Sequence, residues 1–165
     1  IHTVQEDGER ISSSALRNAL ANGDMDQATK LLGRPYGISG HVIHGQKLGR
    51  TLGFPTLNLA VANHLHHRKP ACSGIYTAQV LVLGDKPLPA VASLGVRPTV
   101  EDEGRVLLET HIFDYNADVY GKIITVELLE KIRDEAKYSD LDTLTKAIAS
   151  DAAHARNYFQ KKAYV

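Results

Sequence analysis

Residues 49–59 read Gly-Arg-Thr-Leu-Gly-Phe-Pro-Thr-Leu-Asn-Leu, and the rest of the chain is organised around this stretch. Its two glycines and Arg50 are typical of a tight turn that lets a phosphate approach the backbone. An extended segment follows, in which alternate side chains point to the same face. Thr56 and Asn58 are therefore predicted to point together, with the leucines beside Asn58 on the opposite face. A hydroxyl and an amide oxygen side by side are hard ligands, suited to the Mg²⁺ that a nucleotide carries.

The same stretch also fits a plain hairpin turn with a polar outer face, because glycine-containing turns are common between strands. It is not a P-loop, since it lacks a Gly-Lys-Ser/Thr ending and no helix is expected after it. A nucleotide site here would therefore be built on a barrel or a sheet.

Composition bounds the class of protein. The chain has 165 residues, the size of one domain, and 43% of them are hydrophobic, which is enough for a core. Its 19 basic and 19 acidic residues balance, so we expect no nucleic acid and no membrane surface as partner. Cys72 is the single cysteine, which excludes an intrachain disulfide and favours a reducing, cytoplasmic location. The sequence contains no apolar run of membrane-spanning length and no recognisable signal peptide.

Residues 12–33 are predicted to form a short helical hairpin. Three serines at positions 12–14 precede an Ala/Leu run and favour a helix start there. Gly23 ends the first helix, Asp24 caps the second, and Gly33 ends it.

From residue 37 onward the pattern changes to short strands separated by turns. The strands are predicted at 38–43, 54–60, 75–83, 90–94, 106–113 and 122–129. Six strands at this spacing indicate an all-β barrel or sandwich, and they leave no room for βαβ crossovers. The loop that begins at Gly95 is expected to leave the strand at 90–94.

The last element is predicted to be a helix whose capping box uses Ser139 and Asp142. It carries one apolar stripe at helical spacing: Leu141, Leu144, Ile148, Ala152, Ala155 and Phe159. We expect this helix to lie against the barrel, with the stripe in the core rather than in a ligand site.

A second set of chemically useful residues lies on the strand at 106–113. Glu109 shares a face with Leu107, His111 and Phe113. A carboxylate among apolar neighbours costs free energy unless it is paired or used, and its pKa is predicted to rise, which suits a general base. The alternative is a glutamate exposed on the outer face of a barrel.

Three histidines, His64, His66 and His67, fall in the polar loop predicted at 62–73. Neither a cysteine nor a carboxylate accompanies them at zinc-site spacing. A solvated loop is therefore favoured over a metal site.

The motif Gly-Arg-x-x-Gly-Phe-Pro-Thr-x-Asn-Leu at 49–59 resembles the signature of the riboflavin kinases (flavokinases), with Leu57 where the family usually has Ala. The pattern Glu-x-His-Ile that starts at Glu109, followed by Asp-x-Tyr-Gly at 118–121, resembles the strand that carries the family's catalytic base. The resemblance covers roughly residues 34–160. It implies a mainly β fold: a six-stranded antiparallel Greek-key β-barrel with a C-terminal α-helix, here preceded by the short helical hairpin.

The resemblance implies phosphoryl transfer from MgATP to the terminal ribityl hydroxyl of riboflavin, with FMN and ADP as products. In that reaction Glu109 would take or orient the hydroxyl proton, Asn58 would also touch this hydroxyl, and Thr56 and Asn58 would hold Mg²⁺ and the phosphates. The nucleotide-binding residues implied are Gly49, Arg50, Gly53, Pro55, Thr56, Asn58 and Arg97.

On the flavin side, the resemblance implies Arg133 as a contact that closes on flavin and phosphate, with Tyr138 near the ring. Tyr76 is a further candidate neighbour of the ring. Two of these assignments have plain alternatives. The segment around Arg133 also fits a simple strand-to-helix connection, and the segment around Arg97 fits a proline-containing turn.

Residues 11–17, with Gly-Asp at 23–24 and Leu-Leu-Gly-Arg-Pro-Tyr at 31–36, resemble the end of the adenylyltransferase domain of bacterial bifunctional FAD synthetases. The His-x-x-His motif and dinucleotide-fold core of that domain do not occur in these residues, so we expect no FMN adenylyltransferase activity. Residues 1–33 would then be a helical remnant of that domain and 34–165 the kinase barrel. The missing adenylyltransferase domain of the same parent chain is the implied partner.

Three functional hypotheses follow. The chain is a riboflavin kinase, or a flavin-binding barrel without chemistry that serves as a carrier or sensor. The third, compatible with the first, is that it is a piece of a bifunctional FAD synthetase. Glu109, Thr56 and Asn58 discriminate the first two, because a pure binder needs neither a base nor a pair of metal ligands.

Overall fold

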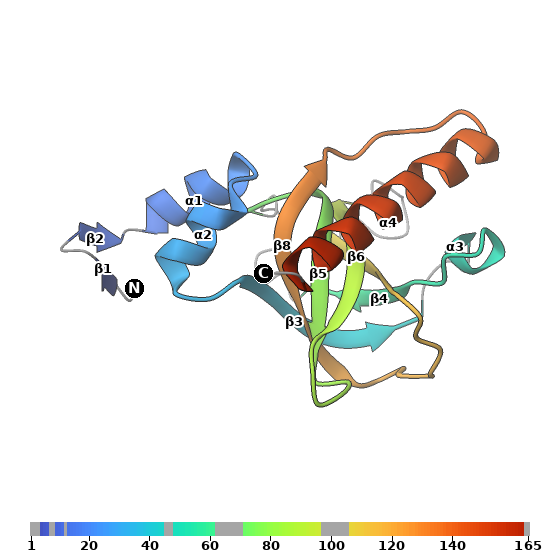
Figure 1. Ribbon diagram of the computed structural model, residues 1–165, viewed down its shortest axis with the longest axis horizontal. Helices are drawn as coiled ribbons and strands as arrows, with labels where there is room; N and C mark the ends of the chain where they lie inside the picture. The colour runs from blue at the N-terminus through green and yellow to red at the C-terminus, as the bar shows by residue number, and fades with distance from the viewer. Residues whose placement is uncertain are drawn as a thin grey trace.

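The computed structural model describes residues 4–6, 9–11, 13–44, 48–61, 71–96 and 106–163 (Figure 1). Its centre is a closed antiparallel barrel with the strand order β3-β4-β7-β6-β5-β8. The barrel strands are β3 (Tyr36–Ile43), β4 (Leu57–Ala60), β5 (Gly74–Leu81), β6 (Leu88–Val96), β7 (Val106–Ile112) and β8 (Ile123–Arg133). The helices are α1 (Ser13–Ala21), α2 (Met25–Leu32), α3 (Leu48–Thr51) and α4 (Leu141–Ala163). The predicted mainly β, six-stranded barrel with a C-terminal helix is confirmed.

The order of the strands is that of a Greek key. β5, β6 and β7 pair with one another in sequence, and β4 lies beside β7. β8 pairs with both β5 and β3 and so closes the barrel. A separate two-stranded ribbon, β1 (Val4–Glu6) with β2 (Glu9–Ile11), precedes the helices and was not predicted.

The organising stretch at 49–59 forms a helical turn followed by a strand, which differs from the predicted turn and long strand. α3 is a single turn, and the backbone N–H of Phe54 donates to the Gly49 carbonyl at 2.7 Å. β4 begins only at Leu57, three residues later than predicted. Pro55 has no N–H to donate to a ladder, so pairing starts after it.

β6 extends further than predicted and ends at Val96. Gly95, which was expected to begin a loop, pairs with Leu107 of β7. The rest of that predicted loop, including Arg97, lies outside the described residues, as do His64, His66 and His67.

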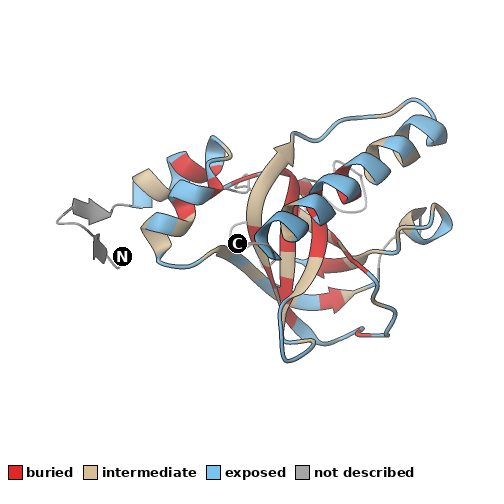
Figure 2. Ribbon diagram, viewed as in Figure 1, coloured by how far each residue is buried: buried red, intermediate tan, exposed pale blue. Residues whose placement is uncertain are grey.

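Burial alternates along the barrel strands, as on β7, so that one side of the sheet faces the core and the other faces outward (Figure 2). On β7, Leu108 and Thr110 are fully buried in the barrel interior. Glu109 and His111 are half-buried and point to the other side of the sheet. The side that carries Glu109 is therefore the outer surface of the barrel.

The predicted helical hairpin is confirmed, and it packs on the barrel. α2 contacts β8 and β3, and Leu20, Met25 and Ala28 are buried in the same apolar cluster as the barrel strands. The side chain of Asp24 accepts from the N–H of Gln27 at 3.1 Å, as expected of the cap of α2. Gly33 adopts the left-handed conformation, with φ of 75°, and ends the helix.

α4 lies across the outer face of the barrel over β5 and β6 (Figure 1). Ala152 and Ala155 are buried there in a second apolar cluster. The predicted stripe is wrong at its start, because Leu141 is 57% exposed. It also differs in role, since Leu144 and Ile148 line a cavity rather than a closed core. Within the described part of the chain, no helix has the length and apolar character needed to cross a bilayer.

The cap of α4 is also corrected. Asp140, rather than Ser139, accepts from the backbone N–H of Thr143 at 2.7 Å and from the Thr143 hydroxyl at 2.9 Å. Both residue types favour the cap position, but α4 begins at Leu141, which puts Asp140 in that place. The same hydrogen bonds lower the pKa of Asp140.

Replacement of Asp140 by Ala is expected to lower the melting temperature at pH 7. The folded-state pKa of Asp140 is lowered, so its stabilisation is present above the unfolded pKa and is lost as the pH falls through the folded value. The gap in melting temperature between parent and variant should narrow from pH 7 towards pH 3, measured by circular dichroism. Asp142→Ala is the control from the same helix turn, and an equal effect there would contradict this assignment of the cap.

Candidate active site

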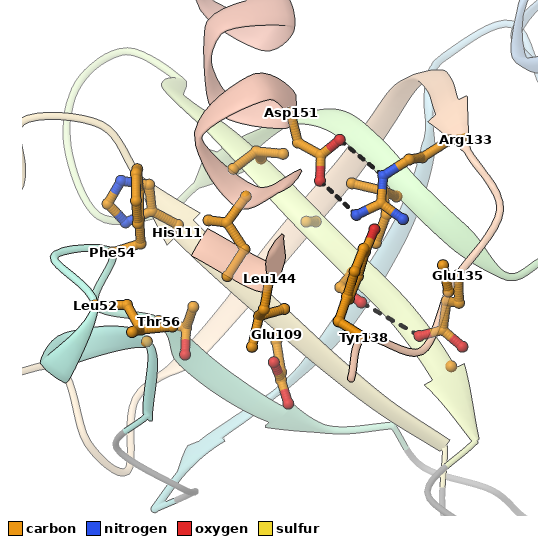
Figure 3. A pocket seen from close by; sticks show the side chains of 18 of the residues that line it. Leu52, Phe54, Thr56, Glu109, His111, Arg133, Glu135, Tyr138, Leu144 and Asp151 are labelled. Carbon is orange, nitrogen blue, oxygen red and sulfur yellow. Dashed lines mark hydrogen bonds and ion pairs between the residues drawn. The ribbon is translucent and has the colours of Figure 1, made fainter. Parts of the chain in front are cut away.

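A first cavity lies between the outer face of the barrel and α4, with a volume of about 500 Å³ (Figure 3). Such a volume suits a small-molecule ligand. Its apolar wall includes Leu52, Phe54, Ile75, Val91, Leu144 and Ile148. Its polar groups include Glu109, His111, Arg133, Glu135, Tyr138 and Asp151. The combination of a long apolar wall and a few converging polar groups suits a flat, mainly apolar ligand that carries polar substituents.

The second cavity, of about 370 Å³, has a more polar lining. It is formed by the end of β3, by residues 55–58 and by the loop 116–120. Its polar groups include Arg50, Thr56, Asn58, Asn116 and Asp118. Thr56 lines both cavities, so the two spaces adjoin at this residue.

Asn58 and Glu109 lie next to each other where β4 pairs with β7. They are direct partners in the antiparallel ladder, so their side chains share one face of the sheet. Asn58 lines the second cavity and Glu109 the first. The strand pair β4–β7, with Thr56 immediately before β4, thus brings a hydroxyl, an amide and a carboxylate to the junction of the two cavities. The predicted pairing of Thr56 with Asn58 agrees with this placement, although Leu57 also reaches the second cavity.

Asn58 is 4% exposed, and its Oδ1 has no hydrogen-bond partner among the described residues. A buried acceptor is normally paired, because leaving it unpaired costs about 1–3 kcal/mol. This oxygen lies in a residue that lines a polar cavity, so it suits a ligand that is bound there, such as a metal ion with its phosphates. Among the described residues, no group of three or more His, Cys, Asp and Glu side chains forms a metal site of its own. Asn58 Oδ1 and the Thr56 hydroxyl are donors in the lining of this cavity that could hold a metal ion together with other ligands.

Glu109 is part of the wall of the first cavity, and it is half-buried. This position differs from the alternative of a fully exposed glutamate on the barrel surface. Leu107 and His111 line the same cavity, as the shared strand face predicts. The raised pKa of Glu109 remains a prediction.

His111 fixes the loop that leads to Thr56. Its Nδ1 lies 2.8 Å from the Pro55 carbonyl oxygen, so the ring N–H donates to that oxygen. The ring also makes edge-to-face contacts with Phe54 and Phe113, with ring centroids 5.6 Å apart in each pair. Sequence reasoning placed His111 beside Glu109 without giving it this role.

Arg133, at the end of β8, forms a forked ion pair with Asp151 of α4. Nε donates to Oδ1 at 2.9 Å and Nη2 donates to Oδ2 at 2.7 Å. These hydrogen bonds raise the pKa of the Arg133 guanidinium above its ordinary value. Tyr138 lies nearby, with its ring centroid 5.7 Å from the Arg133 guanidinium carbon. Both predicted flavin-side residues therefore line the first cavity, but Arg133 is also an anchor for α4.

Sequence reasoning missed Asp151, which is only 6% exposed. A signal was present, because Asp151 lies three residues after Ile148 and four before Ala155, in register with the apolar stripe. An acidic residue on the buried side of a helix needs a partner. The sequence alone did not identify Arg133 as that partner.

Glu135 is a second cavity carboxylate that sequence reasoning did not select. The Ser93 hydroxyl donates to its Oε1 at 3.3 Å. The carboxylate also rests against Gly95, where a Cβ atom would collide with it. The absence of a side chain at Gly95 thus makes room for Glu135 at the cavity wall.

Of the remaining predicted residues that the structure describes, some line one of the two cavities and others line neither. Gly49 lines the first cavity, and a Cβ there would collide with the Phe54 carbonyl oxygen. Arg50 and Pro55 line the second cavity. Gly53, with φ of 88°, permits the turn after α3 but lines neither cavity. Tyr76 is buried in the barrel core, where its hydroxyl donates to the Ser73 carbonyl at 2.9 Å, and it lines neither cavity.

The fold and the site define a class of protein: a Greek-key barrel that carries two adjoining small-molecule cavities, one of them covered by a C-terminal helix. The family model described as riboflavin kinase (flavokinase) matches residues 32–159. The chain therefore belongs to the riboflavin kinase family.

Individual proteins are similar to this chain over most of its length. The chain is 47% identical over 157 residues to the bifunctional riboflavin kinase/FMN adenylyltransferase of Escherichia coli K12, covering 95% of this chain and 49% of that protein. A crystal structure of riboflavin kinase from Trypanosoma brucei superposes with a TM-score of 0.52 at 25% identity, covering 77% of this chain and 81% of the other. A Streptococcus pneumoniae structure described as a macrolide-efflux protein has a TM-score of 0.77 at 35% identity, covering 94% of this chain and 49% of that one. The chain spans about half the length of the curated relatives it matches.

Proposed function

We propose that this chain is an ATP-dependent riboflavin kinase that transfers the γ-phosphoryl group to the ribityl 5′-hydroxyl and forms FMN. The observation that carries the proposal is the junction of two cavities at Thr56, with Asn58 and Glu109 paired across β4 and β7. Transfer between two substrates needs two sites that meet at the reacting atoms. A flavin carrier needs one cavity only, and needs neither a carboxylate nor an unpaired amide oxygen at its edge.

In this proposal riboflavin occupies the first cavity. The apolar side chains of Phe54, Val91 and Ile148 suit the ring system, and Tyr138 and Arg133 border it. The ribityl chain then points towards Glu109, which accepts or orients the proton of the terminal hydroxyl as it attacks phosphorus.

The nucleotide occupies the second cavity, with Arg50 and Pro55 beside its phosphates. Asn58 Oδ1 and the Thr56 hydroxyl would hold Mg²⁺ together with phosphate oxygens. When bound, this ion neutralises charge that develops on the phosphoryl oxygens. The protein groups contribute mainly by positioning the two substrates in line.

We also propose that residues 1–33 derive from an adenylyltransferase domain of a longer parent chain, with residues 34–165 as the kinase unit. The bifunctional relatives, which are about twice as long as this chain, support this division. The chain alone is then expected to make no FAD. A cytoplasmic location is proposed from the single, free cysteine.

The test is to incubate the folded chain with riboflavin, ATP and Mg²⁺ and to separate the flavins by chromatography. We expect FMN without FAD, and loss of FMN formation when the metal is chelated or ATP is omitted. A chain that binds riboflavin but forms no FMN would overturn the kinase assignment and favour the carrier.

A further inference from the structure

The wall of the first cavity contains an ion pair between Arg133 of β8 and Asp151 of α4. The two side chains meet at two points, although a single hydrogen bond would be enough to attach the helix. Asp151 is 6% exposed, and both of its oxygens accept from Arg133, at 2.9 and 2.7 Å. The side chains of Asp151 and Arg133 face each other in the upper part of the view in Figure 3. Forked pairs of this kind fix the plane of the guanidinium as well as its position.

The hydrogen bonds of Arg133 leave part of its guanidinium available. Of its five N–H donors, two are directed to Asp151 and one, on Nη1, to the Asp134 carbonyl oxygen at 3.0 Å. The other two donors have no hydrogen-bond partner among the described residues, and the Arg133 side chain is 28% exposed and lines the cavity. Because Asp151 offsets the positive charge, these donors suit neutral acceptor oxygens.

Besides Asp151, α4 has two other polar attachments to the barrel and the segment that follows β7. Arg156 pairs with Asp114 at 3.2 Å, and His154 pairs with Glu130 at 2.9 Å. None of these four residues lines the first cavity. A buried ion pair is also a weak source of stability, because both charges must leave water.

We propose that Asp151 is a positioning residue, which holds the Arg133 guanidinium in the plane where its free N–H donors meet acceptor oxygens of the bound flavin. The identity of the ligand rests on the proposed function, while the positioning itself rests on the ion pair. Asp151 does not touch the ligand in this proposal and acts through Arg133.

The first test compares Asp151→Asn with the parent chain. Asparagine keeps the size of the side chain but removes the charge and one acceptor, so Arg133 is no longer held by two oxygens. We expect the Kd for riboflavin, measured by flavin fluorescence, and the KM for riboflavin to rise about tenfold, with the KM for ATP unchanged. Asp114→Asn is the matched control. It weakens another ion pair of α4, and asparagine tolerates the positive φ of 54° at that position.

A second test separates positioning from general structural support. Arg133→Met should weaken riboflavin binding about as much as Asp151→Asn, and the double variant should be no weaker than Arg133→Met alone. Arg133→Lys, which keeps the charge but not the fork, is expected to weaken binding as well. The Arg133→Lys variant tests the need for the forked geometry even if the Asp151→Asn protein does not melt cooperatively.

Several results would overturn the proposal. One is an unchanged Kd for riboflavin in Asp151→Asn or in Arg133→Lys. Another is a loss of riboflavin affinity in Asp114→Asn that equals the loss in Asp151→Asn. A third is a double variant of Asp151→Asn and Arg133→Met whose loss of affinity is the product of the two single losses. Failure of the proposed function is recognised separately. A parent chain that forms no FMN but binds riboflavin, with the expected Asp151 effect, refutes the kinase and supports the positioning role. A parent chain that does not bind riboflavin refutes both.

Discussion

Glu109→Gln is expected to reduce the rate of FMN formation by about 10²–10⁴-fold, the usual contribution of a general base. Glutamine keeps the shape of the side chain but cannot accept the hydroxyl proton. Glu109 lies opposite Asn58 in the ladder and lines the first cavity, where riboflavin is proposed to bind, so this change acts at the junction of the two cavities. Because proton transfer belongs to the transition state, kcat should fall much more than the KM for riboflavin changes.

Initial rates of FMN formation, measured by chromatography, check this prediction. Glu127→Gln is the matched control, since its carboxylate accepts from Gln79 at 2.7 Å and lines neither cavity. Melting temperatures of both variants test whether the barrel is intact. If Glu109→Gln retained a rate within about threefold of the parent, the base would have to be sought elsewhere.

Asn58→Leu is expected to abolish most FMN formation while making the protein more stable. The buried Oδ1 of Asn58 has no partner among the described residues, and such an atom costs about 1–3 kcal/mol. Leucine removes that cost, and the adjoining cavity provides room for its larger side chain. We expect the free energy of unfolding to rise by about 1 kcal/mol, which corresponds to about 2–4 °C in melting temperature. The rate should fall by about 10²-fold or more, because the proposed protein ligand of the phosphate-bound ion is lost.

Thr110→Val is the control for this separation of stability from activity. The Thr110 hydroxyl is also buried without a partner in the described part of the chain, but it lies inside the barrel and lines neither cavity. The valine variant should be stabilised by a similar amount and keep the rate of the parent. Thermal unfolding measures the stability of the Asn58→Leu and Thr110→Val variants, and chromatography of FMN measures their activity. A destabilised Asn58→Leu protein with normal activity would show that Asn58 is a structural residue.

The sequence by itself predicted much of the fold, for local reasons. The alternation on β7 and the glycine and aspartate caps of the hairpin are short-range patterns, and all were found as expected. Errors fell where two local signals competed. Asp140 rather than Ser139 caps α4, and β4 starts only after Pro55 because proline cannot donate to a ladder.

The sequence predicted only part of the candidate site. The sequence predicted Thr56 with Asn58 on one strand face and Glu109 on another, because period-two alternation needs no tertiary information. It did not show that Asn58 and Glu109 face each other, since the β4–β7 register joins segments about fifty residues apart. It also missed Asp151, because a partner for a buried charge is known only when a helix is docked.

The sequence alone therefore determined the six barrel strands apart from some of their ends, the helical hairpin, the presence of a C-terminal helix and the residues proposed for phosphoryl transfer. These depend on neighbours within a few residues, and local propensity and periodicity decide them. Only the tertiary structure decided that two cavities meet at Thr56, that α4 covers one of them, and that Asp151 holds Arg133 at its wall. Barrel closure and helix docking bring together residues that are distant in sequence, and no local pattern specifies those contacts.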